Sequence, residues 1–124
     1  MNRTRKDISS LACMPCRGGI PPLIDTKIRE HMKAVLEWRL KEDGPNRIEK
    51  TFKFKDFNEA MSFVNKVADV AEKQDHHPVI FIHWNRVTLT FWNHSIDGLH
   101  YNDFIMAAKI DRLYAVSSKG PNHC

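Results

Sequence analysis

Apolar residues recur at helical spacing in three stretches of the chain, and each stretch predicts an amphipathic helix. The first helix begins at Asp25 or Thr26, either of which can cap it through a side-chain oxygen. Its apolar positions are Ile28, Met32, Val35 and Leu36. The last helix spans roughly residues 101–116, with Asp103 in the first turn, where a negative charge suits the helix dipole. Its apolar side carries Met106, Ile110 and Leu113.

The middle helix has the clearest signals. Asp56 opens it as a cap, and Glu59 lies three residues later, as in a capping box. The helix must end near Gln74, because Pro78 disfavours helical backbone at the residue before it. The stripe that we expect to face the core contains Phe57, Met61, Val64, Val67, Ala68 and Ala71.

Two strands are predicted between the first and the middle helix. Trp38 and Leu40 alternate with charged residues, and a turn at residues 42–46 follows them. The next strand carries Ile48, Phe52 and Phe54 on one parity. Lys50 has the same parity and breaks the alternation, so we expect this strand to lie at the sheet edge or to be only partly buried.

A hairpin is predicted after the middle helix, with Asn85-Arg86 as its two-residue turn, because Asn tolerates a positive φ angle. The pairs in this register are Trp84 with Val87, Ile82 with Leu89, and Ile80 with Phe91, all apolar. A one-residue slip would mix the two faces, which supports the register. The other face carries His77, Val79, Phe81, His83, Thr88, Thr90, Trp92 and His94, a mixture that we interpret as an interface with a second subunit.

The order helix, two strands, helix, two strands, helix predicts an α+β fold, in which a four-stranded antiparallel sheet has three helices on one face. A chain of 124 residues is the length of one domain and can bury its own core. We therefore expect a single domain over residues 1–124, with flexible polar tails at residues 1–10 and 117–124.

Charge and cysteine content narrow the class of protein further. The formal net charge of +4 is spread along the chain, which favours a solvated surface over a nucleic-acid or membrane surface. No apolar run approaches the roughly 20 residues of a membrane span, and no secretory signal is visible, so we expect a cytoplasmic protein. Cys13 and Cys16 form a Cys-x-x-Cys pair without a second pair to complete a zinc site. Reduced thiols are the interpretation that we favour, with a disulfide and a metal or redox role as alternatives.

The histidines offer candidate chemistry. His76 and His77 lie between a helix end and a proline, and in the predicted register His77 lies opposite His94, with Cβ atoms roughly 4.5–5.5 Å apart. His76 would lie just outside that volume. Glu72 and Asp75 supply carboxylates nearby, Glu72 on the helix face of His76. Such a group suits proton transfer, but it also suits a metal ion or a pair of surface histidines with a packed third, and the residues alone leave all three open.

A family resemblance goes further than the spacing. The run Ala71-Glu72-Lys73-Gln74-Asp75-His76-His77-Pro78 resembles the signature of the pterin-4a-carbinolamine dehydratases. The same family is matched by Asn93-His94, by Gly98-Leu99 and Asp103, by Phe52-Lys53-Phe54-Lys55-Asp56-Phe57, by Trp38, and by the leader Cys16-Arg17-Gly18-Gly19-Ile20-Pro21-Pro22-Leu23. These matches cover roughly residues 11–115 in unbroken order.

The resemblance implies an enzyme that removes the 4a-hydroxyl of 4a-hydroxytetrahydropterin as water and yields the quinonoid dihydropterin, with no metal and no organic cofactor. It implies three catalytic histidines, His76, His77 and His94. The expected substrate-binding residues are Glu72, Asp75, Pro78, Asn93, Ser95, Ile96 and Trp38. Glu72 and Asp75 would orient the histidines or the pterin, and the backbone of residues 93–96 would line its ring.

The resemblance also implies partners, and the chain departs from the family pattern at two positions. Family members form homodimers or homotetramers and recycle the pterin of aromatic amino acid hydroxylases. Animal members also act as dimerisation cofactors of a transcription factor, which is the alternative function for this chain. Two positions depart from the family: Asn93 stands where a Thr is common, and His100 stands where a Ser or Thr commonly caps the last helix. His100 is a poor cap, so that helix start either frays or is held in another way.

Overall fold

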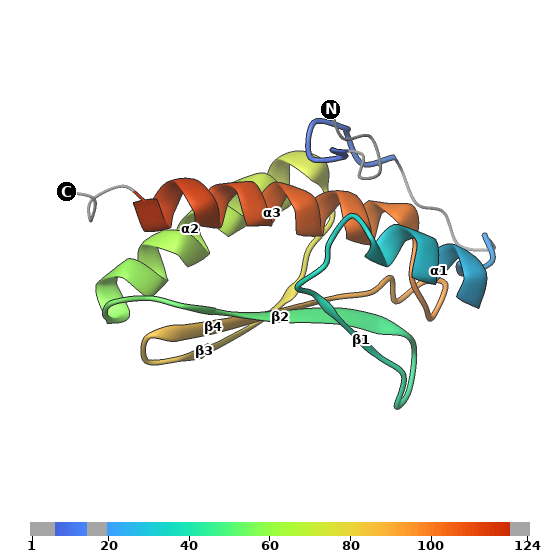
Figure 1. Ribbon diagram of the computed structural model, residues 1–124, viewed down its shortest axis with the longest axis horizontal. Helices are drawn as coiled ribbons and strands as arrows, with labels where there is room; N and C mark the ends of the chain where they lie inside the picture. The colour runs from blue at the N-terminus through green and yellow to red at the C-terminus, as the bar shows by residue number, and fades with distance from the viewer. Residues whose placement is uncertain (1–6, 15–19, 120–124) are drawn as a thin grey trace.

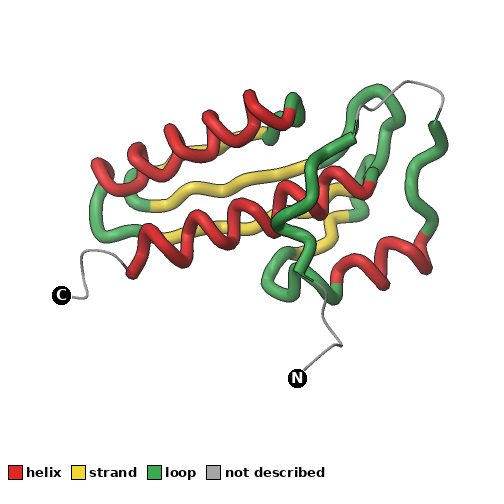
Figure 2. The backbone as a smooth tube through the Cα atoms, turned by 90° about the horizontal axis from the view of Figure 1, so that it is seen from above, coloured by secondary structure: helices red, strands yellow, loops and turns green. Residues whose placement is uncertain are grey.

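The computed structural model describes residues 7–14 and 20–119, with side chains up to residue 116. Its elements are α1 (Asp25–Met32), β1 (Arg39–Lys41), β2 (Arg47–Lys53), α2 (Phe57–Gln74), β3 (Val79–His83), β4 (Arg86–Phe91) and α3 (Tyr101–Lys119). The helices lie on one side of the antiparallel sheet (Figure 1). Seen from above, α2 and α3 run over the strands as two long neighbouring helices (Figure 2). The predicted α+β class and the order of elements are confirmed.

Near both ends, the described chain is more buried or more helical than the predicted polar tails. Ile8 and Ser9, which we expected in the first tail, are buried. Ser9 accepts hydrogen bonds from Lys109 and Arg112 of α3 through its carbonyl and its hydroxyl, at 2.8 and 3.0 Å. The helix α3 itself continues to Lys119, three residues beyond the predicted end. In the part of the chain that is described, no helix has the length and apolar character needed to cross a bilayer.

Of the two alternatives for the second strand, the edge position was wrong and partial burial is confirmed, because only Ile48 and Phe52 of β2 are buried. The strand order is β1-β2-β4-β3, so β2 is paired on both sides. Lys50 does face the helices, and its amine lies 2.8 Å from Asp111 of α3 and 3.1 Å from Glu37. A lysine is therefore accommodated on the core side because a carboxylate comes from the covering helix to meet it.

The hairpin register also differs from the prediction. The pairs are Val79↔Thr90, Ile80↔Leu89, Phe81↔Thr88, Ile82↔Val87 and His83↔Arg86. The turn residues are therefore Trp84 and Asn85, and the positive φ angle of 56° belongs to Trp84. Asn85 is used differently: its amide donates to the Phe54 carbonyl at 3.0 Å, and its own carbonyl accepts from the Phe54 N–H at 2.8 Å. These contacts with the end of β2 anchor the turn one residue earlier than we expected, while the two faces keep their parity.

The helix α2 begins and ends where predicted, and its buried stripe is the predicted one only in part: Val67 and Ala71 are buried as expected. Asp56 caps it by accepting from the Glu59 N–H at 2.9 Å. The buried positions are Ala60, Phe63, Val67 and Ala71, whereas Phe57 and Ala68 are exposed and Met61 and Val64 are half-buried. Phe63 decides this orientation, because its ring lies 5.0 Å from those of Phe52 and Phe54 on the sheet.

The helix α1 differs from the prediction at both ends. Ile24 occupies the N-cap position without a side-chain cap, so neither Asp25 nor Thr26 caps the helix. Asp25 instead pairs with Arg29 at 2.9 Å. The helix ends at Met32, and Leu36 is exposed rather than part of an apolar face.

Candidate active site

The end of α2 determines where the two adjacent histidines point. Asp75 adopts a left-handed conformation, with φ 54° and ψ 43°, and its N–H donates to the Glu72 carbonyl at 3.3 Å. The next N–H, of His76, donates to the Ala71 carbonyl at 3.1 Å, which completes a Schellman-type ending. This turn sends His76 under the helix into the core and leaves His77 at the surface. The predicted arrangement, with His76 outside the shared volume, was wrong.

His76 is held on two sides. Its side chain is only 9% exposed, and its Nε2 atom lies 2.6 Å from Oδ1 of Asp103, which is fully buried. Its ring stacks on Phe91, with centroids 5.9 Å apart and planes within 4°. A carboxylate only accepts hydrogen bonds, so Nε2 donates in this pair, and in the neutral ring Nδ1 has the accepting lone pair. The tautomer and the orientation of the ring are therefore set by the protein.

The start of α3 supplies that carboxylate. Oδ2 of Asp103 accepts the backbone N–H of His100 at 2.9 Å, and Nδ1 of His100 accepts the backbone N–H of Asn102 at 3.0 Å. This is a reciprocal cap of the capping-box kind, with an imidazole in the place of a hydroxyl. Burial lowers the pKa of His100, the Asp103 carboxylate raises it, and a positive charge on His76 would lower it further. The helix start is thus held by His100 itself rather than frayed.

His77 and Glu72 form a second pair at the surface. His77 Nε2 lies 2.8 Å from Glu72 Oε2, and both side chains are largely exposed. By the reasoning applied to His76, the Glu72 carboxylate favours the tautomer with the proton on Nε2. Two consecutive imidazoles, one buried and one exposed, therefore each have a carboxylate partner.

The loop after β4 carries the remaining predicted site residues. Asn93 and Gly98 are joined by two backbone hydrogen bonds, of 2.8 and 3.3 Å. The Asn93 side-chain oxygen accepts from the Ser95 N–H at 2.9 Å and from its hydroxyl at 2.7 Å. Ile96 is buried beneath the loop. Asn93 and Ser95 therefore build the loop through contacts with each other.

His94 is exposed on this loop and lies against Trp92, with ring centroids 4.3 Å apart. The prediction that His77 faces His94 across the hairpin was wrong, because the observed register, continued two residues, places His77 opposite Trp92. In the described residues, His76, His77 and His94 contact Asp103, Glu72 and Trp92 respectively.

Trp38 occupies a different environment from the one expected of a pterin-binding residue. Its side chain is 2% exposed, and its indole N–H donates to the Asp111 carboxylate at 3.1 and 3.2 Å. Its ring lies 6.0 Å from those of Phe52 and Phe91. Trp38 therefore packs in the core against Phe52 and Phe91 and offers little surface to a ligand.

Asp103 is the residue that sequence reasoning left out of the site. Asp103 matches the family pattern, but the sequence analysis explained it only by its favourable position in the helix dipole. Its place three residues after the helix cap was the available signal, because that position faces back toward the cap. A fully buried aspartate bonded to a histidine is an uncommon arrangement that the pattern of apolar residues cannot reveal.

The N-terminal segment lies against the same end of the molecule. The Cys13 N–H donates to the Gln74 side chain at 2.8 Å, and Asn102 exchanges two hydrogen bonds with Met14, of 2.8 and 2.6 Å. Burial raises the pKa of the Cys13 thiol to about 11. Cys16, the other half of the predicted pair, lies outside the described residues. Within those residues, no three His, Cys, Asp or Glu side chains are grouped so that they could hold a metal ion.

The fold and the site together define a small α+β protein whose candidate active site combines a buried His–Asp pair with two exposed histidines. The chain belongs to the pterin 4 alpha carbinolamine dehydratase family, whose model matches residues 21–113. A transcriptional coactivator/pterin dehydratase from Brucella melitensis has a similar crystal structure, with 39% sequence identity and a TM-score of 0.70. That match covers 75% of this chain and 98% of the other.

A second solved structure that resembles this chain is that of a pterin dehydratase-like protein identified as a RuBisCO assembly factor in the alpha-carboxysome. It is 23% identical, with a TM-score of 0.55, and the match covers 63% of this chain and 89% of the other. At this identity the likeness concerns the fold alone.

Proposed function

We propose that this protein dehydrates 4a-hydroxytetrahydropterin to quinonoid dihydropterin and water by histidine acid–base catalysis, as a step of pterin recycling. In this reaction the C4a–O bond breaks and the hydroxyl leaves as water after it receives a proton. The N5–H proton is removed, and its electron pair forms the N5=C4a double bond. The reaction therefore needs one proton donor and one proton acceptor, and neutral imidazoles can act as either.

The observation that carries this proposal is the pairing of His76 with Asp103 at 2.6 Å, one residue away from the pairing of His77 with Glu72 at 2.8 Å. Each carboxylate favours the proton on Nε2 and leaves Nδ1 as the atom that accepts a proton. We assign the protonation of the leaving hydroxyl to His77 or His94, which are exposed, and the N5 proton to another histidine of the set. Asp103 joins the site as the residue that orients His76.

The substrate-binding part of the proposal rests on the loop of residues 93–98. We propose that its backbone, including that of Ser95 and Ile96, lines the pterin ring, and that Pro78 and the carboxylates of Glu72 and Asp75 lie at the other side. Trp38 is left out of the proposed site, because its ring is buried in the core. A cytoplasmic location and a metal-free, cofactor-free reaction complete the proposal.

The direct test follows the decay of a carbinolamine pterin with and without the protein, after treatment with a chelator. Acceleration is expected to survive chelation, and the single variants His76→Ala, His77→Ala and His94→Ala should each lower the rate by roughly 10²–10⁴-fold. His83→Ala is the matched control, because His83 is exposed on β3 and outside the proposed site. Full activity in all three site variants would refute the assignment, and no acceleration by the unmodified protein would refute the function.

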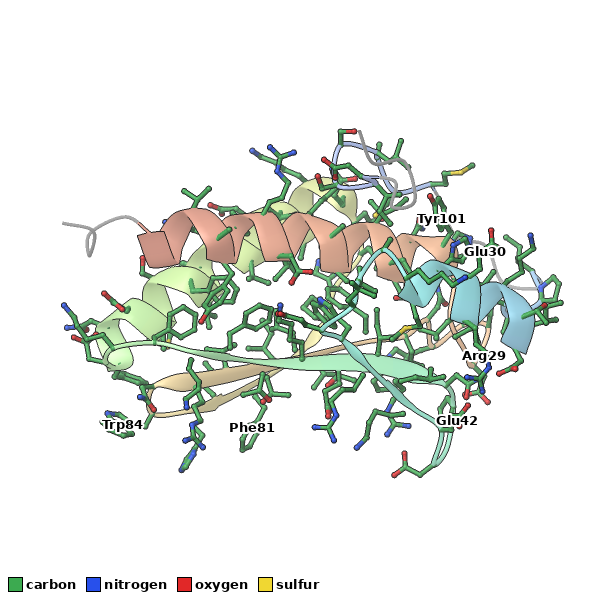
Figure 3. All side chains as sticks on the ribbon, viewed as in Figure 1. Arg29, Glu30, Glu42, Phe81, Trp84 and Tyr101 are labelled. Carbon is green, nitrogen blue, oxygen red and sulfur yellow. The ribbon has the colours of Figure 1, made fainter. Side chains whose placement is uncertain are left out.

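A second candidate is a protein-binding role, as a dimerisation cofactor for a regulator. It is favoured by the name of the Brucella melitensis relative, a transcriptional coactivator/pterin dehydratase. It is also favoured by Val79, Phe81 and Trp84, which are exposed on or beside β3, the strand at the sheet edge. Phe81 and Trp84 project from the sheet face opposite the helices (Figure 3).

The same apolar surface supports our proposal that the chain forms a homodimer or homotetramer. We propose separately that this assembly works beside an aromatic amino acid hydroxylase. The molar mass in solution, measured by light scattering, should exceed the 14.5 kDa of one chain. Phe81→Glu should shift it toward the monomer, whereas Phe57→Glu, on the exposed start of α2, should not. A monomeric protein would contradict this proposal without bearing on the dehydratase activity.

A further inference from the structure

The cap of α3 is chemically unusual. Serine, threonine, aspartate and asparagine are the preferred N-cap residues, because their oxygens accept a backbone N–H without having to change protonation state near neutral pH. Here Nδ1 of His100 accepts the Asn102 N–H at 3.0 Å. An imidazole accepts at Nδ1 only when that nitrogen has no proton, so the cap exists only with the neutral ring. A proton on Nδ1 would place one N–H against another.

The cap and the candidate active site share one carboxylate. Oδ2 of Asp103 accepts the His100 N–H at 2.9 Å, and Oδ1 lies 2.6 Å from His76 Nε2. Asp103 is fully buried, so its side chain cannot exchange His100 for water while the turn remains in place. The orientation of His76 therefore depends on the backbone at His100.

We propose that His100 is a titratable positioning residue, which holds Asp103 and through it His76 in the reactive orientation while its ring is neutral, and releases them when Nδ1 is protonated. This inference rests on the proposed dehydratase function for its effect on rate. It does not rest on it for the coupling between the two histidines.

The groups around His100 set where this titration falls. Burial lowers the pKa of His100, the charge of a protonated His76 lowers it further, and the Asp103 carboxylate raises it. The N-terminal end of a helix also disfavours a positive charge. Burial is the largest of the effects of burial, Asp103 and His76, so the pKa of His100 is lowered, and the ring is neutral near pH 7 and becomes charged below the ordinary value of about 6.5.

The first test compares pH–rate profiles. His100→Ser and His100→Asn keep an oxygen that can cap α3 but cannot titrate in this range. Near pH 7.5 both should match the original protein. One pH unit below the His100 pKa, both should be about tenfold faster than it, because about nine tenths of its His100 rings are then protonated. His100→Ala should be slower at all pH values.

His31→Phe is the matched control, because His31 is also half-buried with a pKa lowered by burial, and its contacts are with the rings of Tyr101 and Phe104 rather than with Asp103. It should keep the acid limb of the original protein. Identical profiles for the original protein and for His100→Ser would overturn the inference.

The second test does not need activity. Imidazole nitrogen shifts measured by NMR should show the His76 ring responding at the pH where His100 titrates, and this response should be absent in His100→Ser. If the original protein has no dehydratase activity, the proposed function fails, while this measurement still decides the coupling. If the nitrogen chemical shifts of His76 do not change when His100 titrates, the inference is overturned even in an active enzyme.

Discussion

Replacing Asp103 with alanine should destabilise the protein by about 3–5 kcal/mol. The carboxylate is fully buried and takes part in two hydrogen bonds, 2.6 Å from His76 Nε2 and 2.9 Å from the His100 nitrogen. Hydrogen bonds to a charged group contribute about 1.5–3 kcal/mol each, and breaking a buried pair by removing one partner costs about 3–5 kcal/mol. This is a large share of the roughly 5–15 kcal/mol that stabilises an ordinary domain.

Urea unfolding followed by tryptophan fluorescence would measure this loss, since Trp38 lies in the core. With a urea slope of about 2 kcal/mol per molar, the midpoint should fall by about 2 M. Asp103→Asn separates stability from activity. Its amide oxygen still accepts from His100, but its NH₂ group donates to His76 and forces the ring proton to Nδ1. It should cost only about 1–2 kcal/mol while lowering activity strongly.

Asp69→Ala is the control for the Asp103 variants, because Asp69 is exposed on α2, and its replacement should change stability by less than about 0.5 kcal/mol. An ordinary substitution lowers the free energy of unfolding by about 1 kcal/mol. If Asp103→Ala lowers it by no more than this, the buried pair contributes little and the reasoning is refuted.

Three further predictions concern other parts of the fold. Gly98→Ala should cost about 1–3 kcal/mol in urea unfolding, because the new Cβ would lie 2.6 Å from Cβ of Pro22; an unchanged midpoint would show that the loop yields. With the other two cysteines replaced by serine, Cys13 should react with iodoacetamide at pH 8 about 100-fold more slowly than in the urea-unfolded chain, since its pKa is about 11; equal rates would contradict its burial. The urea midpoint should fall as the pH drops below about 6.5, because burial holds the folded-state pKa of His31 and His100 below the unfolded value, so the unfolded chain binds more protons; a midpoint constant down to pH 5 would contradict this sign.

The fold was predictable because local signals agreed along the chain. The cap at Asp56 and the stop before Pro78 bound α2 correctly, and the alternation of apolar residues gave four strands in the right order. The parity of the hairpin was also predictable, since one face had to be apolar. Its register was not, because the turn is anchored by hydrogen bonds between Asn85 and Phe54, which lie 31 residues apart in sequence.

The predictions of the orientation of α2 and of the position of β2 failed for a related reason. The apolar stripe of α2 is broad enough to allow more than one orientation. The choice is made by Phe63, which packs on Phe52 of β2 and on Phe54, the residue that follows this strand. Likewise, Lys50 indicates an edge strand only if no carboxylate is available above the sheet. Asp111 supplies one from α3, and the chain pattern does not show that the two residues meet.

In the candidate site, the sequence did not predict where the two adjacent histidines would lie. His76 and His77 are adjacent, and periodicity cannot say which of the two points inward once the helix has ended. The left-handed conformation of Asp75 decides it, and an aspartate there has no glycine-like signature that would announce such a turn. Asp103 was not predicted as a site residue for the converse reason, because its charge suits a helix start and so already has a structural explanation.

The sharing of Asp103 between the α3 cap and His76 makes a specific demand on any mutational study of this protein. A loss of activity in an Asp103 variant has two sources, a disturbed helix start and a misdirected imidazole, and activity alone cannot separate them. His100 can separate them, because its side chain caps the helix while only its backbone N–H contacts Asp103. Acid should therefore first affect the opening turn of α3, where these groups lie, because the aromatic packing of Phe52, Phe63 and Tyr114 contains no group that titrates between pH 5 and 7. Activity should then be lost at a higher pH than the core packing.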